Sequence, residues 1–261
     1  MFSCPLIELK QFSLQTQHRT LISNLDWSIH LGQVWAIIGL SGCGKSSLLR
    51  AIAGLSCVHE FVYSGQIKWQ QQVIQQYSNQ QRVKFLAWVP QNELFMAHNM
   101  TVQDRVLLGL YAAKPGLQWE SCDDLQRVEA ALAHFGLQGR RLHVLHQLSG
   151  GEVKRVALAC AYLQNATVTL FDEPLSQLDW RCQVQIGQTF LDYPNLAQRA
   201  VVWVTHDPNM ALRFATHVLA FTEQGRIWQG RVADIVGHDL FEQVYGCRIQ
   251  ASLQPELYYP A

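Results

Sequence analysis

The chain has 261 residues, of which 49% are hydrophobic, and its 20 basic side chains balance 20 acidic ones to give a formal net charge of +0. This length and apolar content support a full-sized core and about one to two compact units. The lack of excess positive charge argues against nucleic acid as a partner. No apolar stretch approaches the roughly 20 residues that span a bilayer, and the first residues lack the layout of a signal peptide. Seven scattered cysteines without a C-x-x-C pair argue against a disulfide framework or a zinc site and favour a reducing compartment.

Residues 6–37 are predicted to form a small β region. Strand-like patterns at Leu6–Leu9 and Leu25–Ile29 flank a polar stretch, 15–20, that is typical of a turn or loop. The apolar run Val34–Ile38 then predicts a buried parallel strand.

This run leads directly into Gly39–Ser46, which matches the phosphate-binding pattern G-x-x-x-x-G-K-[ST] at every fixed position. A helical pattern follows, and its apolar face is made by Leu48, Leu49, Ile52 and Leu55. The loop thus lies between a strand and a helix, which is the context that the motif requires.

The residue types of this loop suit polyphosphate. Glycines let main-chain N–H groups turn inward, and the helix N-terminus adds partial positive charge. Lys45 is a mobile cation that reaches the β- and γ-phosphates, and Ser46 offers its hydroxyl to Mg²⁺. We interpret Cys43 as a tolerated small residue, with a redox-sensitive thiol as the alternative. The predicted nucleotide-binding residues are Gly39, Leu40, Ser41, Gly42, Cys43, Gly44, Lys45, Ser46 and Ser47.

The middle of the chain turns from β to helical patterns. Gly65–Trp69 predicts a strand, and the glutamine-rich segment 70–81 predicts a solvated loop, with a low-complexity functional segment as the alternative. Val83–Val89 predicts another strand, which ends shortly before Gln91. From residue 101 to 163 the apolar spacing predicts a helical unit inserted between two β-rich parts.

Two further buried strands end in polar residues. Leu148–Glu152 precedes a helix, and the apolar run Val168–Phe171 then ends in Asp172-Glu173. The run Val201–Val204 ends shortly before His206.

Taken in order, these motifs resemble those of the ATP-binding cassette (ABC) ATPases, and the resemblance covers nearly the whole chain. A phosphate loop alone occurs in many NTPases, whereas Leu148–Glu152 together with a strand ending in Asp172-Glu173 is far more specific. The resemblance implies an α/β fold: a P-loop NTPase core with a RecA-like parallel sheet, an N-terminal antiparallel β region and an inserted α-helical subdomain. The implied divisions are a core of residues 1–90 and 160–240, a helical subdomain of 91–159, and a C-terminal tail of 241–261.

The family's residue roles imply a catalytic and metal-binding set. Asp172 lies at the sheet edge, where it would hold Mg²⁺ together with Ser46 and Gln91. Glu173 would polarise the attacking water, and His206 would contact the γ-phosphate and orient Glu173. Outside this context the acidic pair is typical of a solvated turn, and the histidine of a structural cap. The implied catalytic residues are Glu173, His206, Lys45 and Gln91.

The segment Ser149–Gly151 makes a second helix N-terminus with exposed N–H donors. The resemblance implies that it faces the γ-phosphate held by a second copy of the chain, so that a head-to-tail dimer clamps two ATP molecules. The alternative is an ordinary helix cap. Glu152 stands where the family more often has glutamine, and Gln177 replaces a small residue. The implied contacts on this side are Ser149, Gly150, Gly151, Glu152 and, across the dimer interface, Asp179.

One feature departs from the family. Its members often stack adenine on an aromatic residue in the loop after the first strand, and the matching position lies near Thr16. No aromatic residue occupies this loop, so adenine stacking is weaker here or His18 replaces the aromatic ring.

Two functional classes fit the motifs: the energy-coupling subunit of a membrane importer, and a soluble ABC ATPase that serves assembly work such as iron–sulfur cluster biogenesis. The stretch Met100–Gly109 and the tail Leu240–Cys247 resemble importers of iron–siderophore, haem or vitamin B12, with generic packing as the alternative. An importer subunit binds a membrane permease near residues 91–110, works indirectly with a solute-binding protein, and lies on the cytoplasmic face of the inner membrane. The candidate permease contacts, alternatively core residues, are Leu94, Phe95 and Met96.

Overall fold

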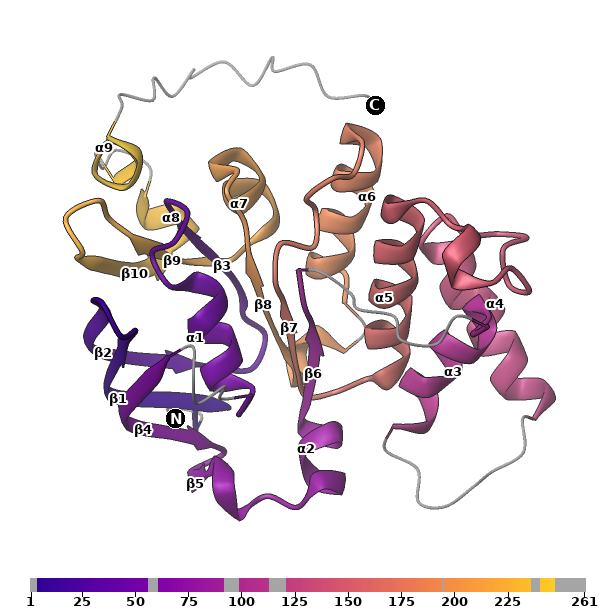
Figure 1. Cartoon of the computed structure of the whole chain (residues 1–261), viewed down its shortest axis with the longest axis horizontal. Helices are drawn as coiled ribbons and strands as arrows, with labels where there is room; N and C mark the ends of the chain where they lie inside the picture. The colour runs from indigo at the N-terminus through magenta and orange to yellow at the C-terminus, as the bar shows by residue number, and fades with distance from the viewer. Residues whose placement is uncertain are drawn as a thin grey trace.

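The computed structural model describes residues 4–55, 61–91, 99–112, 121–193, 195–235 and 240–246. Within these ranges the chain folds into two β-sheets and several helices, which confirms the predicted α/β class (Figure 1). The candidate permease contacts Leu94, Phe95 and Met96 lie outside the described residues.

The N-terminal β region is an antiparallel sheet with the strand order β2-β1-β4-β5. Alternating apolar side chains of β1, including Ile7 and Leu9, are buried, as expected for a sheet with one covered face. The two longest strands of this sheet are joined by residues 16–19, close to the predicted turn. The strands are β1 (Ile7–Gln15), β2 (Thr20–Ile29), β4 (Val62–Trp69) and β5 (Gln72–Val73).

The second sheet has the order β10-β9-β3-β8-β7-β6, and its five strands from β9 to β6 are parallel. All residues of β3 are buried, because helices or the antiparallel sheet cover both faces. Ala36 packs into one core with the later helices, and its neighbour Ile37 packs into the other core with α1. The strands are β3 (Val34–Gly39), β6 (Leu86–Val89), β7 (Val168–Phe171), β8 (Ala200–Val204), β9 (His217–Phe221) and β10 (Ile227–Arg231).

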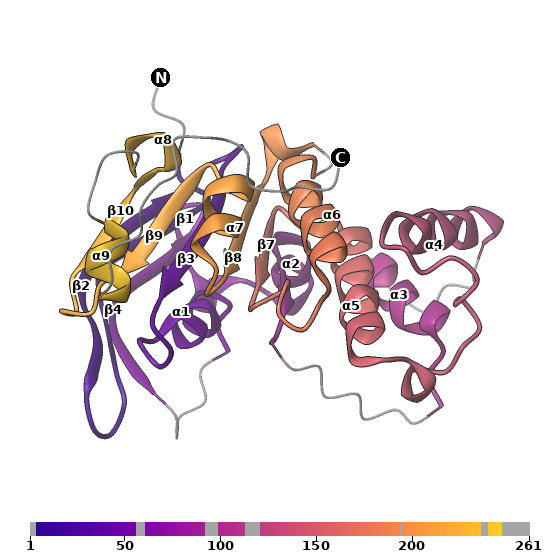
Figure 2. The same cartoon turned by 90° about the horizontal axis from the view of Figure 1, so that it is seen from above.

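The predicted helical stretch forms α3, α4 and α5, which pack on one another. Figures 1 and 2 place α3 and α4 on the opposite side of the molecule from β1 and β2. A Cβ added to Gly109 on α3 would lie 2.1 Å from the carbonyl oxygen of Cys160 on α5, so only glycine allows this close crossing. In the part of the chain that the structure describes, no helix has the length and apolar character needed to cross a bilayer. The helices are α1 (Lys45–Ile52), α2 (Asn79–Phe85), α3 (Val102–Tyr111), α4 (Cys122–His134), α5 (Gly150–Gln164), α6 (Trp180–Leu191), α7 (Pro208–Phe214), α8 (Val232–Ile235) and α9 (Leu240–Tyr245).

Some local predictions were wrong. The glutamine-rich segment is not one loop, since it contains β5, a short 3₁₀ turn (Ile74–Gln76) and the start of α2. Ser78 caps α2 by accepting a hydrogen bond from the N–H of Gln81, whose side chain binds back to the N–H of Ser78. This capping box extends a helix through Phe85, so the predicted strand begins only at Leu86.

Candidate active site

The phosphate loop begins where β3 ends and closes at the first turn of α1. Gly44 has a φ of 105°, and a Cβ added there would lie 3.1 Å from the Cβ of Leu21, so the turn favours glycine on both counts. The helix then starts at Lys45 without a side-chain cap, which leaves N-terminal N–H groups for a ligand.

Lys45 is buried, and its ammonium is folded back into the loop. It donates hydrogen bonds to the carbonyl oxygens of Gly39 at 2.9 Å and Leu40 at 2.8 Å. Burial lowers the pKa of Lys45, while Cys43, Glu173 and Asp172 act in the opposite direction. The Lys45 ammonium thus lies within the loop, beside the N-terminus of α1.

Asp172 follows β7 and lies beside the phosphate loop, as the sequence predicts. It is 4% exposed, and its Oδ1 accepts a hydrogen bond of 2.9 Å from the hydroxyl of Ser46. Burial raises the pKa of Asp172, whereas the hydrogen bond from Ser46 lowers it. A hydroxyl and a carboxylate are thereby brought together at the start of α1.

Both carboxylate oxygens of Glu173 contact another side chain. Gln91 Nε2 donates to Oε2 at 2.9 Å, and Oε1 contacts Nε2 of His206. Three side chains that are far apart in the sequence therefore meet, because β6, β7 and β8 are parallel neighbours and end at the same edge of the sheet. The main chain of Glu173 has a φ of 50°, which is costly for a residue other than glycine.

A cavity of about 430 Å³ is lined by residues of the phosphate loop together with Gln91, Glu173 and His206, whereas Asp172 lies behind Ser46 and does not line it. Its lining also includes Arg19, which donates a hydrogen bond of 2.6 Å to the carbonyl oxygen of Gly42. His18, proposed from the sequence as a substitute for the aromatic ring, does not line this cavity. The lining residues are Thr16, Arg19, Leu21, Ser41, Gly42, Gly44, Lys45, Ser46, Ser47, Gln91, Glu173 and His206.

The segment at the start of α5 does not line this cavity. Ser149 caps the helix, and its N–H and hydroxyl both bind the carboxylate of Glu152 at 2.9 Å. These hydrogen bonds lower the pKa of Glu152, which also pairs with Arg140 at 3.2 Å. Asp179 likewise caps a helix, accepting a hydrogen bond of 2.9 Å from the N–H of Cys182. Within one chain, therefore, these residues act as helix caps.

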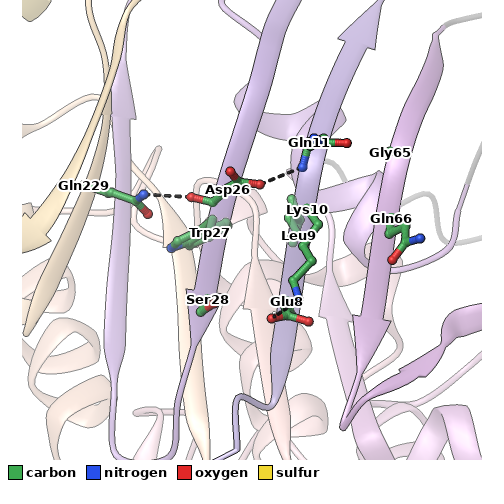
Figure 3. Close-up of a pocket in the computed structure, with 10 residues that line it drawn as sticks. All are labelled: Glu8, Leu9, Lys10, Gln11, Asp26, Trp27, Ser28, Gly65, Gln66 and Gln229. Carbon is green, nitrogen blue, oxygen red and sulfur yellow. Dashed lines mark hydrogen bonds and ion pairs between the residues drawn. The ribbon is translucent and has the colours of Figure 1, made fainter.

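A cavity of about 890 Å³ lies elsewhere, over the strands of the antiparallel sheet (Figure 3). Its polar groups are joined to one another: Asp26 accepts a hydrogen bond from the N–H of Gln11 and its carbonyl accepts one from Gln229, each at 2.7 Å (Figure 3). A bulge shapes it, since Gln11 has a φ of 48° and a Cβ on Gly65 would lie 2.4 Å from the carbonyl oxygen of Gln11. None of the predicted site residues lines it.

The sequence motifs assigned no role to three residues that line the cavity or contact Glu173: Arg19, Lys154 and Ser176. Lys154 and Ser176 contact the main chain of Glu173, which no sequence pattern reveals. Arg19 had a usable signal, because it is the charged residue of the loop in which an aromatic ring was sought.

The family profile described as ABC transporter matches residues 22–176. The chain belongs to the ABC transporter family. The petrobactin import ATP-binding protein FpuD of Bacillus anthracis is 30% identical over 249 residues, which cover 95% of this chain and 89% of FpuD. The ferric enterobactin transport ATP-binding protein FepC of Escherichia coli is 29% identical over 239 residues, covering 92% and 86%.

The solved structure of an ABC transporter assigned to the metal-chelate type, in an inward-facing conformation, is similar with a TM-score of 0.74. It is 23% identical, and the match covers 93% of this chain and 89% of that one. At this identity the likeness shows the ABC fold alone. ABC ATP-binding subunits hydrolyse ATP to power transport, so this family member is an ATP-binding protein and an ATPase.

Proposed function

We propose that the chain is the energy-coupling ATPase subunit of an ABC membrane importer that carries a metal chelate such as an iron–siderophore, haem or cobalamin. The similar proteins FpuD and FepC are ATP-binding proteins of petrobactin import and ferric enterobactin transport, which supports this solute class. These relatives do not favour the alternative of a soluble assembly ATPase. The observation that carries the ATPase part of the proposal is the Glu173 carboxylate, held between Gln91 and His206 at the cavity of the phosphate loop, and the similarity to FpuD and FepC carries the transport part.

In this proposal the cavity binds ATP with its phosphates on the loop Gly39–Ser47. Lys45 would exchange its two carbonyl partners for phosphate oxygens, which are better acceptors because they are charged. Its burial strengthens that attraction, since the effective dielectric constant is lower than in water. The base would lie toward Thr16, Arg19 and Leu21, which also line the cavity.

A Mg²⁺ ion fits the oxygen atoms present. Ser46 and Asp172 supply a hydroxyl and a carboxylate that already lie 2.9 Å apart, and Gln91 adds an amide oxygen nearby. The ion would neutralise phosphate charge during hydrolysis. The raised pKa of Asp172 fits this assignment, because a buried carboxylate without a cation is costly.

Hydrolysis in this scheme depends on Glu173. Its carboxylate would accept a hydrogen bond from the attacking water, with His206 and Gln91 fixing its two oxygens. Lys45 and His206 would stabilise the charge that develops on the γ-phosphate. The left-handed main chain of Glu173 would serve to aim this carboxylate, which is a use for local strain.

The second half of each site would come from another copy of the chain. Ser149, Gly150 and Gly151 lie outside the cavity of their own phosphate loop, which supports a role on the partner's ATP. Since Glu152 occupies the hydroxyl and N–H of Ser149, the N–H groups of the two glycines are the donors left for phosphate. Asp179 would act across the same interface.

We further propose that a permease docks beside residues 91–110 and holds the chain at the cytoplasmic face of the inner membrane, with a solute-binding protein acting indirectly. The chain would divide into a core of 1–90 and 160–240, a helical subdomain of 91–159, and a tail of 241–261. The boundary at residue 159 falls inside α5, so this helix would join the core to the subdomain.

Replacing Glu173 by glutamine tests the central role. General-base catalysis contributes about 10²–10⁴-fold to rate, so Glu173→Gln is expected to slow ATP hydrolysis by that order while ATP still binds and traps a dimer. Hydrolysis is measured by phosphate release, and the dimer by size-exclusion chromatography with and without ATP. Hydrolysis at the parental rate would show that Glu173 is not the base.

The transport role is tested by a pull-down from detergent-solubilised membranes with the tagged chain as bait. A polytopic permease recovered in equal amount is the expected result, and its identity narrows the solute. Recovery of soluble assembly factors alone would contradict the importer assignment and leave the ATPase intact.

A further inference from the structure

Lys154 is a buried cation outside the motifs described so far. It lies in the first turns of α5, just after Leu148–Glu152, and is 7% exposed. Burying an ammonium group is costly unless its donors are satisfied. Burial lowers the pKa of Lys154, and Glu173 and Asp172 oppose that shift. The buried ammonium of Lys154 must therefore have acceptors within the protein.

All three donors of the Lys154 ammonium have acceptors, and none is a carboxylate. They contact the carbonyl oxygen of Glu173 at 2.6 Å, the hydroxyl of Ser176 at 2.6 Å and the carbonyl oxygen of Ser176 at 3.3 Å. The hydroxyl of Ser176 in turn donates to the same Glu173 carbonyl at 2.9 Å. The ammonium and this hydroxyl therefore converge on one oxygen, that of the peptide that follows Glu173.

The carbonyl oxygen held by Lys154 and Ser176 belongs to Glu173, so these contacts restrain its main chain. With a φ of 50°, Glu173 has a left-handed main-chain conformation that is strained for a residue other than glycine, so surrounding contacts must hold it. Gln91 and His206 hold the carboxylate end. Lys154 and Ser176 hold the main-chain end.

We propose that Lys154 is a positioning residue for ATP hydrolysis: it fixes the main chain of Glu173 and ties it to the helix that begins at Ser149. The proposal rests on the role of Glu173 given above. Because α5 carries the segment that would contact the partner's ATP, the hydrogen bond from Lys154 is a direct link from that helix to the chain's own Glu173. An ATP bound in one site would thus help align the carboxylate that acts in the other.

The test compares purified full-length variants by kcat, by KM, by affinity for a fluorescent ATP analogue and by Tm. Lys154→Met keeps the aliphatic stem and removes the donors. We expect kcat to fall about 10- to 100-fold, as small misplacements of reacting groups do, with the affinity for the analogue nearly unchanged. Lys154→Gln retains an amide N–H donor for the Glu173 carbonyl, so its kcat is expected to lie between those of Lys154→Met and the parent. It replaces Lys154→Met in the test if that variant does not fold.

Arg155→Met is the matched control. Arg155 is the next residue of α5, and it also donates to main-chain carbonyls, those of Phe135 at 3.3 Å and Gly136 at 3.1 Å, away from Glu173. We expect it to lower Tm without a comparable loss of kcat. The positioning role would be overturned if Arg155→Met lost as much kcat as Lys154→Met although the two variants had the same Tm. It would also be overturned if kcat were unchanged in the Lys154 variants. A parental rate in Glu173→Gln would instead refute the proposed function.

Discussion

The hydrogen bond between Ser46 and Asp172 allows a sharp test of the site in the absence of nucleotide. The variant Ser46→Ala removes one hydroxyl and nothing else. Asp172 is 4% exposed and loses the Ser46 donor 2.9 Å from its Oδ1. The variant therefore leaves a buried carboxylate less well satisfied, which is a destabilising change.

The expected cost follows from the type of hydrogen bond. One that involves a charged group contributes about 1.5–3 kcal/mol to the free energy of unfolding, against about 0.5–1.5 kcal/mol for a neutral pair. In a chain of this size each kcal/mol shifts Tm by about 2–4 °C, so the expected loss is about 3–12 °C. In the Asp172→Asn background, Ser46→Ala removes only a neutral hydrogen bond and should cost about 0.5–1.5 kcal/mol.

The pH dependence has a definite sign. Burial raises the pKa of Asp172 above its ordinary 3.8, and the Ser46 hydrogen bond pulls it back down. The hydrogen bond stabilises the ionised form, so its contribution is present above the folded pKa and fades as the pH falls through it. Because the net shift is upward, the native state binds the proton more tightly than the unfolded chain. Asp172→Asn removes this pH-dependent penalty. The free energy of unfolding of the variant minus that of the parent should therefore be larger at neutral pH than at acid pH.

Equilibrium urea unfolding of the nucleotide-free chain, at neutral and at mildly acidic pH, measures these differences. The reasoning is wrong if Ser46→Ala is as stable as the parent at neutral pH. It is also wrong if the cost is the same in the parent and in the Asp172→Asn background, since the two side chains would then not be coupled.

Two further predictions concern the base and the helical packing. Arg19→Ala is expected to weaken ATP binding by about 1–3 kcal/mol, because Arg19 lines the cavity and its guanidinium can stack on adenine. Arg19→Tyr should restore part of the affinity by ring stacking. Titration of each variant with ATP and with GTP measures these affinities. If Arg19→Ala bound ATP as tightly as the parent, Arg19 would not contact the nucleotide. Gly109→Ala is expected to lower the free energy of unfolding by about 1–3 kcal/mol through overpacking against Cys160, and urea unfolding that matches the parent would show that α3 and α5 separate freely.

Much of the site was predictable because its parts are local patterns. The phosphate loop was predicted because a strand, a glycine-rich turn and a helix follow one another in the chain. Asp172 and Glu173 were predicted because they follow a mainly apolar four-residue run that forms β7. The strand predicted from Val83 was less accurate, since the capping box at Ser78 competes with apolar periodicity and favours a helix.

The sequence by itself determined that this chain has a phosphate loop, an acidic strand end and the α/β class, since each depends on residues within one element and the turn beside it. Only the tertiary structure decided that Gln91, Glu173 and His206 meet, because their contact depends on the order of parallel strands in the sheet. It likewise decided that Arg19 rather than His18 lines the cavity and that Lys154 reaches the Glu173 carbonyl. These contacts join residues of distant segments, and no local periodicity contains that information.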